Sequence, residues 1–124
     1  MPNKYGLSET ELEIMEVIWS YARPVYFNEL LDDFQKQGKT WKKQTLHTYL
    51  TRLTQKGALS FDKQGRKNIY QAVGTKEDFI SRWTNHLVDT SFDHSRSKFM
   101  AALLGDRESL SQEELDELRK FLNE

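Results

Sequence analysis

Apolar side chains recur at helical spacing in the first part of the chain, and the first helix has a clear start. Ser8 and Glu11 form the S-x-x-E pattern, in which a hydroxyl and a carboxylate each satisfy a free N–H group at a helix start. The predicted helix runs to about Tyr21, because Pro24 disfavours helical backbone just before it. A second helix is predicted over residues 27–37, with apolar positions facing inward.

A third helix, predicted from Trp41 to Lys56, has one narrow apolar stripe. At about 100° per residue, the side chains of Leu46, Leu50 and Leu53 lie on the same side of the helix. The other side is polar and carries no acid; it comprises Gln44, Thr45, His47, Thr48, Thr51, Arg52 and Gln55. Because solvated helix faces usually mix both signs of charge, we interpret this face as reserved for a partner.

The period then changes from helical to alternating. Residues 58–62 predict a strand with Leu59 and Phe61 on one side, residues 63–66 a turn, and residues 67–73 the return strand. Three helices followed by a hairpin with a basic tip predict a winged helix-turn-helix.

The rest of the chain predicts three short amphipathic helices, two of which begin with further capping patterns at Thr75 and Ser111 and one of which spans residues 92–104. Each shows a single apolar stripe, so about 50 residues make a poor core by themselves. We predict that a second copy covers the stripes, although folding back onto the first domain remains open. The residues predicted to form the dimer are Phe79, Trp83, Leu87, Phe92, Phe99, Leu103, Leu115, Leu118 and Leu122.

These segments predict a mostly α fold with a small β-hairpin. We expect a winged-helix DNA-binding domain at residues 1–74 and a helical dimerisation domain at residues 75–124. The length of 124 residues and a hydrophobic content of 37% suit a folded chain of this size. No segment approaches the ~18 apolar residues of a membrane helix, and no signal-peptide core is present, so we expect a cytoplasmic location without membrane insertion.

The formal net charge of −1 hides an uneven distribution of charge. Residues 36–67 contain nine basic side chains and only one acid, Asp62, and so carry +8, whereas the remainder carries −9. Such asymmetry indicates a surface that binds a polyanion, although a solvated basic face without a partner would have the same composition.

Within this basic segment the residue types suit DNA. Gln can pair with adenine, and Thr can contact a thymine methyl group or a phosphate. The predicted DNA-binding residues are Trp41, Lys42, Lys43, Gln44, Thr45, His47, Thr48, Arg52, Arg66 and Lys67. Arg52 could instead pair with an acid of the second helix, and we expect Trp41 to be partly buried with its indole N–H on the DNA backbone.

Enzyme chemistry finds little support in the sequence. The three histidines lie on different predicted elements, and no metalloprotease, nucleophile-elbow or phosphate-loop motif occurs. His86 and His94, with Asp89 and Asp93, suggest at most a weak metal site, and exposed polar residues explain them more simply. We therefore predict no catalytic residues, no metal and no cofactor. A winged helix that binds another protein remains an alternative to DNA binding.

Four segments resemble the penicillinase repressor family of the BlaI/MecI type, which also includes CopY-like copper repressors. They are LSETELEIMEVIW at 7–19, TWKKQTLHTYLTRLTQKGAL at 40–59, GRKNIYQAV at 65–73 and LSQEELDELRKFL at 110–122. The resemblance implies a homodimeric winged-helix repressor of antibiotic (β-lactam) resistance genes. It also implies operators with dyad symmetry and TACA/TGTA-type half-sites.

The resemblance further implies induction by a membrane-bound antibiotic-sensing protease, which cuts an Asn-Phe bond in the dimerisation region. Lys98 and Phe99 occupy that position, so the Phe is kept and the Asn is not. The W-S-P-K-T start of the family's recognition helix is here Trp41-Lys42-Lys43-Gln44-Thr45. The copper branch senses metal through cysteines, and this chain has none, which excludes that mechanism.

Overall fold

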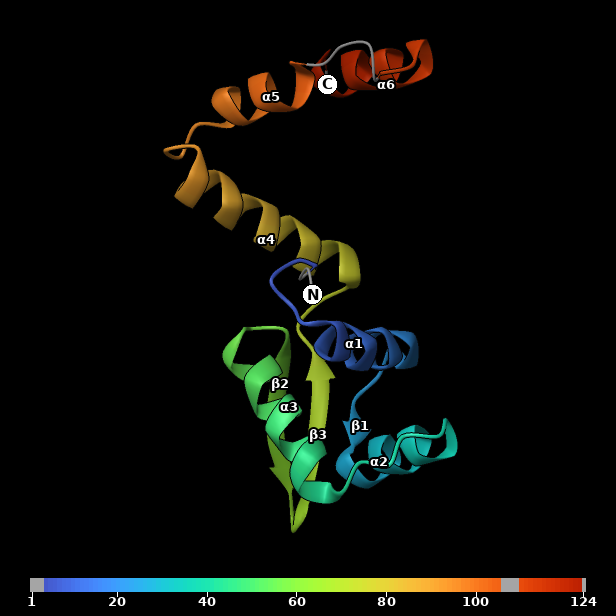
Figure 1. Cartoon of the computed structure of the whole chain (residues 1–124). Helices are drawn as coiled ribbons and strands as arrows, with labels where there is room; N and C mark the ends of the chain where they lie inside the picture. Colours follow the sequence, from blue (N-terminus) through green and yellow to red (C-terminus); the bar gives the residue numbers. More distant parts are fainter. Residues whose placement is uncertain (1–3, 106–109, 124) are drawn as a thin grey trace. The chain divides into compact units, whose positions relative to one another are not determined.

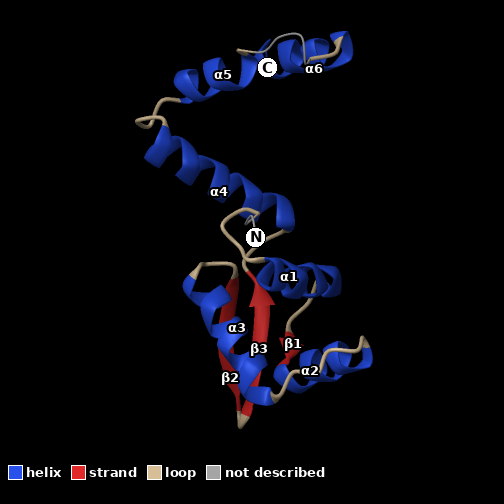
Figure 2. Cartoon of the chain, viewed as in Figure 1, coloured by secondary structure: helices blue, strands red, loops and turns tan. Residues whose placement is uncertain are grey.

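The computed structural model describes residues 4–105 and 110–123, and these residues form six helices and three strands (Figures 1 and 2). In chain order they are α1 (Glu9–Tyr21), β1 (Val25–Tyr26), α2 (Phe27–Lys36), α3 (Lys43–Gln55), β2 (Leu59–Gln64), β3 (Lys67–Ala72), α4 (Lys76–Ser91), α5 (Arg96–Leu104) and α6 (Gln112–Asn123). Two compact units divide the chain after Thr84, within α4. The mostly α fold with a small hairpin is confirmed.

The first helix begins as its capping pattern predicts. The Glu11 backbone N–H donates to Ser8 Oγ at 3.2 Å, and the Ser8 N–H donates to Glu11 Oε1 at 2.8 Å. After α1, Ala22 takes a left-handed conformation with φ of 54°, which turns the chain toward β1. Local interactions therefore set both ends of this helix: hydrogen bonds at the start and a left-handed residue at the end.

The sheet contains three antiparallel strands in the order β1-β3-β2. In the hairpin, Gln64 pairs with Lys67, so Gly65 and Arg66 alone form the turn. Gly65 has a φ of 65°, which suits the first central position of a type II′ hairpin turn. The hydrophobic pattern does not predict β1, because a strand of two residues has no periodicity and exists only through its pairing with β3.

The core of the first unit lies between the three N-terminal helices and the sheet (Figure 1). The predicted apolar stripes fill it: the side chains that are at most 2% exposed include Ile14, Met15, Ile18, Leu30, Phe34, Leu46, Leu50, Leu53 and Leu59. The apolar stripe of α3 is therefore buried inside the unit, and the polar side of the helix faces outward.

Three sequence predictions need correction. The third helix begins at Lys43 rather than Trp41, because the Trp41 ring packs on Phe34 of α2, with 5.0 Å between centroids, and the Trp41 carbonyl accepts from Gln35 Nε2. The predicted turn over residues 63–66 is confined to Gly65 and Arg66, because Lys63 and Gln64 still pair with Asn68 and Lys67 in the hairpin. Phe61 is 46% exposed, and its ring contacts Tyr70.

The predicted helix over residues 92–104 begins only at Arg96. Asp93 and His94 both have positive φ, at 53° and 62°, which ends α4 and interrupts the helical backbone. Ser95 then caps α5 by accepting the Lys98 N–H at 3.1 Å.

In the second unit, the rings of Phe92 and Phe99 meet edge to face at 5.4 Å. The large apolar side chains Leu103, Phe121 and Leu122 are 57%, 78% and 72% exposed. No helix in residues 4–105 and 110–123 is long and apolar enough to cross a membrane.

Candidate nucleic-acid interface

The recognition helix candidate, α3, is divided into a buried and an exposed side. Leu46, Leu50 and Leu53 are 0% exposed, which fixes the rotation of the helix about its axis. On the opposite side Gln44, Thr45, Thr48 and Arg52 are all exposed. The hydroxyl of Thr48 donates to the Gln44 carbonyl at 2.9 Å, and its oxygen remains an acceptor for a partner.

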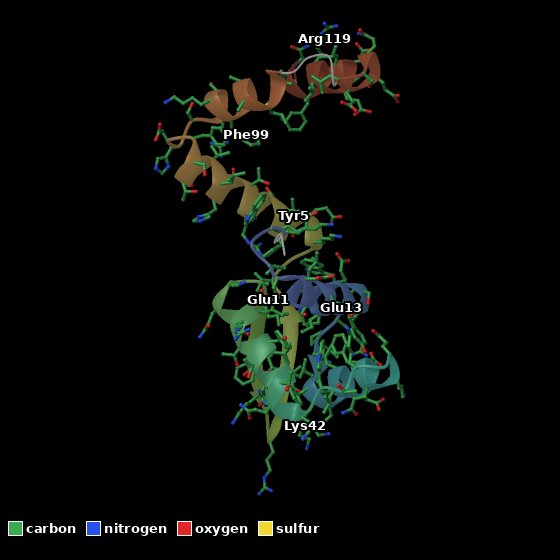
Figure 3. The ribbon with its side chains drawn as sticks, in the orientation of Figure 1. Tyr5, Glu11, Glu13, Lys42, Phe99 and Arg119 are labelled. Atoms are coloured by element: carbon green, nitrogen blue, oxygen red, sulfur yellow. The ribbon has the colours of Figure 1, made fainter. Side chains whose placement is uncertain are left out.

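The N-terminal end of α3 is positively charged. Lys42 has extended backbone at the N-cap and Lys43 begins the helix; both side chains are exposed (Figure 3, Lys42 labelled). No acid lies in the first turn. Free backbone N–H groups and two lysines therefore gather at one helix end, an arrangement that favours phosphate.

Ion pairing separates the nine basic residues of the 36–67 segment into two groups. Lys36, Lys39 and Lys56 pair with Asp32, Glu13 and Glu11 at 2.9, 2.8 and 2.7 Å. Within the described part of the chain, the other six form no ion pair: Lys42, Lys43, Arg52, Lys63, Arg66 and Lys67. Three of them lie at the start or on the outer side of α3 and three on the hairpin, and five of the six are predicted DNA-binding residues, Lys63 being the exception. The pairing of Arg52 with an acid of α2, the alternative left open by the sequence, does not occur.

The hairpin, or wing, is tied to the start of α2. Tyr26 Oη donates to Gln64 Oε1 at 2.9 Å, and Lys67 Nζ lies 5.5 Å from the centre of the Tyr26 ring. These contacts hold Gln64 and Lys67, the pair next to the turn, while Arg66 remains exposed in the turn itself. The wing therefore presents its cations from a supported position.

Two predicted DNA-binding side chains, Trp41 and His47, pack partly against the core of the first unit. The Trp41 ring is half-buried, as expected, between Phe34 and Tyr49, at 5.0 and 5.7 Å from their centroids. The His47 ring is half-buried and stacks on Phe27 at 4.4 Å, with 22° between the planes. This stacking covers one face of the imidazole and fixes its plane.

A hollow of about 260 Å³ lies between α3 and the wing. Its walls include Thr51, Gln55 and the exposed ring of Phe61, together with Asn68 from β3. Sequence analysis did not assign Phe61 or Asn68 to the interface. Strand alternation put Phe61 on the same side as Leu59 and gave no sign of a contact with α3, and only the hairpin register brings Asn68 beside the helix.

Buried charge supports the C-terminal end of α3. Glu11 is 2% exposed, and its Oε1 accepts from Lys56 Nζ at 2.7 Å. Burial by itself would raise the pKa of Glu11, but hydrogen bonds from Lys56 and from Ser8 outweigh that effect and hold the pKa below its ordinary value. Glu11 is therefore ionised at neutral pH and neutralises Lys56.

The residues predicted to form a dimer occupy different environments. Phe79 is 7% exposed and packs on Trp19 at 5.9 Å, and Trp83 meets Tyr5 edge to face at 6.0 Å. Both contacts lie within the first unit, so the Phe79 ring is already covered. The more exposed members, Leu103 and Leu122, lie on α5 and α6.

The predicted cleavage position lies in the first turn of α5. Lys98 is exposed, and its ammonium lies 3.2 Å from Asp93 Oδ2. Phe99 is half-buried against Phe92, and its N–H donates to the Ser95 carbonyl at 3.2 Å (Figure 3, Phe99 labelled).

The suggested metal-binding residues do not form a cluster. His94 Nδ1 lies 3.2 Å from Asp89 Oδ1 on an exposed surface. No group of three or more His, Cys, Asp or Glu side chains that could hold a metal ion occurs among residues 4–105 and 110–123.

Comparisons with known proteins agree over nearly the whole chain. The model of the family described as penicillinase repressor matches residues 7–124. The chain is 31% identical to the penicillinase repressor of Bacillus licheniformis over 95% of this chain and 90% of that protein. It is 29% identical to the methicillin resistance regulatory protein MecI of Staphylococcus aureus (strain N315), over 99% of this chain and 98% of that protein.

A solved structure extends the agreement to three dimensions. The DNA-binding domain of the repressor BlaI in solution is similar to this chain with a TM-score of 0.53 and 36% identity, over 63% of this chain and 93% of that domain. The complex structure of hsRosR-SG shares the fold at 18% identity, with a TM-score of 0.51 over 86% of this chain and 96% of that one.

Proposed function

Because this chain belongs to the penicillinase repressor family, we propose that it is a dimeric DNA-binding repressor of β-lactam resistance genes. Residues 1–74 bind operator DNA and residues 75–124 join two copies. In this proposal α3 enters the major groove, with Gln44, Thr45 and Thr48 toward the bases. The protein acts in the cytoplasm, where its operators are accessible.

The distribution of unpaired cations carries this proposal. Six basic side chains at the start and on the outer side of α3 and on the wing form no ion pair in the described structure, whereas Lys36, Lys39 and Lys56 of the same segment do. An unpaired cation costs nothing in solvent, but a set of six on one pair of elements suits a polyanion. Lys42, Lys43, Arg52, Arg66 and Lys67 therefore position the protein on phosphates, and Trp41 and His47 support the same face.

Salt dependence of DNA binding tests the proposal. A duplex with TACA/TGTA-type half-sites in dyad arrangement should bind with an affinity that falls steeply with salt, by a log–log slope of about −0.9 for each phosphate contacted. The Lys67→Ala variant should lower the magnitude of that slope by about one per bound chain.

The Lys36→Ala variant is the matched control, since it also removes one lysine but from the pair with Asp32 on α2. Its slope should stay close to that of the wild type. A flat salt response of the wild type would support instead the alternative that this winged helix binds another protein.

Exposed apolar side chains support the dimer. Leu103 on α5 and Leu122 on α6 are 57% and 72% exposed. Burying such side chains between two copies contributes about 25 cal/mol for each Å² removed from water. The remaining members of the proposed dimer set are Leu87, Phe92, Phe99, Leu115 and Leu118, while Phe79 and Trp83 pack within their own chain.

Proteolysis between Lys98 and Phe99 is the proposed route of induction, by a membrane-bound antibiotic-sensing protease. A helix end frays more readily than its middle, so the first turn of α5 can open to the extended form that proteases bind. Cutting there separates α5 and α6 from the DNA-binding unit, and a single unit loses the affinity gained from two linked half-sites.

The induction route is tested by following the intact chain after a β-lactam challenge. The proposal expects the chain to be cut as the controlled genes switch on. Intact repressor persisting while those genes are expressed would contradict it. Mapping of the bound promoters should in addition find a β-lactamase gene among them.

A further inference from the structure

A tight turn near the N-terminus lies between the recognition helix and α4. Lys4 and Leu7 form a bridge, with N–H to carbonyl distances of 3.1 and 2.9 Å, and Tyr5 and Gly6 between them both have positive φ, at 57° and 76°. Two positive φ values in succession define a type I′ turn. Leu7 is 1% exposed, so the turn is anchored in the core of the first unit.

One side of this turn contacts the end of α3. The ammonium of Lys56, the residue that follows α3, donates to the Gly6 carbonyl at 3.0 Å and to Glu11 Oε1 at 2.7 Å. Glu11 is itself held by Ser8 at the start of α1. The C-terminal end of the recognition helix is thus joined by hydrogen bonds to the N-terminal turn.

The other side of the turn contacts α4. Tyr5 meets Trp83 edge to face at 6.0 Å, and a Cβ atom at Gly6 would lie 3.4 Å from Trp83 Cδ1 (Figure 3, Tyr5 and Glu11 labelled). The φ of 76° at Gly6 favours glycine, and a Cβ atom there would be in van der Waals contact with Trp83. Trp83 therefore rests against both residues of the turn.

A second attachment of α4 lies one turn earlier along the helix. Phe79 packs on Trp19 of α1 at 5.9 Å, and Lys76 Nζ pairs with Glu16 at 2.6 Å. Because Phe79 and Trp83 are four residues apart, they lie on the same side of α4. One attachment allows a helix to swing, whereas two attachments on one side fix its direction.

We propose that the turn formed by Tyr5 and Gly6 is a specificity-determining element, which fixes the direction of α4 relative to α3 and so sets the half-site spacing that the dimer accepts. This inference rests on the proposed function, in which the segments that follow α4 join two copies. Each base pair added between half-sites rotates one of them by roughly 34° about the DNA axis. A rigid α4 cannot follow that rotation, whereas a loosened one can.

The experiment compares DNA duplexes with one TACA/TGTA-type half-site and with dyads whose half-sites are moved apart by single base pairs. The wild type should lose about tenfold in affinity for each inserted base pair. Tyr5→Ala and Trp83→Ala should reduce that loss to about threefold or less, while their affinity for the single half-site stays within about twofold of the wild type.

Two further variants separate positioning from general destabilisation. Tyr21→Ala removes another half-buried tyrosine, whose ring lies 4.8 Å from the Arg23 guanidinium, and should keep the wild-type spacing dependence. Tyr5→Phe retains the ring on Trp83 and should also behave as the wild type.

A measurement without DNA follows from the absence of cysteine in the sequence. Spin labels attached to cysteines introduced at the exposed positions Gln55 and Thr90 report the distance between the end of α3 and the end of α4. The distance distribution should broaden in Trp83→Ala and stay narrow in Tyr21→Ala.

The inference is overturned if Tyr5→Ala and Trp83→Ala keep the wild-type spacing dependence and the narrow distance distribution. It is also overturned if they lose affinity for the single half-site, because the turn would then support base recognition directly. A wild type that binds dyads no more tightly than half-sites contradicts the proposed dimeric repressor, and this inference with it.

Discussion

The carboxylate of Glu11 makes both a local and a distant contact. Its bond with the Ser8 N–H lies within one helical turn, and the S-x-x-E spacing predicted it. Its bond with Lys56 joins two helices, and nothing in the local sequence indicates it. The residues of α3 show the same contrast between local and distant contacts. Helical spacing predicts that Thr48 lies on the exposed side, whereas the stacking of His47 on Phe27 appears only in the folded structure.

Glu11 should make stability depend on pH. Its pKa is lowered in the folded state, so its contribution is fully present above the ordinary glutamate pKa and is lost as pH falls through the folded value. Glu11→Gln should cost about 1–3 kcal/mol at neutral pH and flatten the acid side of the stability curve. Urea unfolding from about pH 7 to about pH 3 measures both effects.

Glu9→Gln is the matched control, because Glu9 is an exposed acid in the first turn of the same helix. It should leave the pH dependence nearly unchanged. If the free energy of unfolding depended on pH equally in the two variants, the buried pair of Glu11 with Lys56 would not stabilise the fold.

Helix starts with a capping pattern were well predicted from sequence. The cap of α4 forms as expected, with the Thr75 N–H donating to Asp78 Oδ2 at 2.9 Å and the Asp78 N–H to Thr75 Oγ1 at 3.1 Å. These bonds lower the pKa of Asp78. Local hydrogen bonds need no partner element, whereas the late start of α3 depends on Trp41 packing against α2.

Gly74→Ala should weaken the start of α4. Gly74 has a φ of 77°, and a Cβ atom there would lie 2.6 Å from Asp78 Oδ2, so the carboxylate must leave its cap position. Gly38→Ala imposes a similar backbone strain, at a φ of 94°, but meets no atom within 4 Å.

Both variants should lose about 1 kcal/mol or more to strain, with the larger loss for Gly74→Ala because a helix cap is lost as well. Thermal unfolding measures the difference. Equal melting temperatures for the two variants would contradict the role assigned to the cap.

At the scale of the whole molecule, the chain leaves apolar side chains of α5 and α6 in solvent. Leu122 and Phe121 are 72% and 78% exposed, although the first unit buries its apolar stripes almost completely. A single chain therefore buries the apolar side chains of the first unit but not those of the second, as the proposed dimer requires.

Leu118→Asp combined with Leu122→Asp should convert the dimer to a monomer with little change in the melting of the DNA-binding unit. Charged side chains would have to be buried between the copies, which is strongly unfavourable. Sedimentation equilibrium measures the association, and operator affinity should fall toward that of a single half-site.

Lys120→Asp introduces the same side chain on the opposite side of α6, at an exposed position, and should remain dimeric. Dissociation of both variants to the same extent would argue that net charge, rather than the apolar stripe, controls association.

The sequence by itself determined the winged-helix order of elements, the helix caps, the buried leucine stripe of α3 and the basic segment. Each of these follows from contacts or periodicity within a few residues, which the order of side chains specifies directly. Resemblance over the whole chain added the family, and the family model confirmed it.

Only the tertiary structure decided which of the nine basic residues stay unpaired, that β1 exists, and that Phe79 and Trp83 pack within their own chain. These features join residues far apart along the chain, and spacing carries no information about such partners. The side chain of Trp83 shows the consequence: its helical stripe suggested a dimer contact, whereas the fold places it on the N-terminal turn beside the end of the recognition helix.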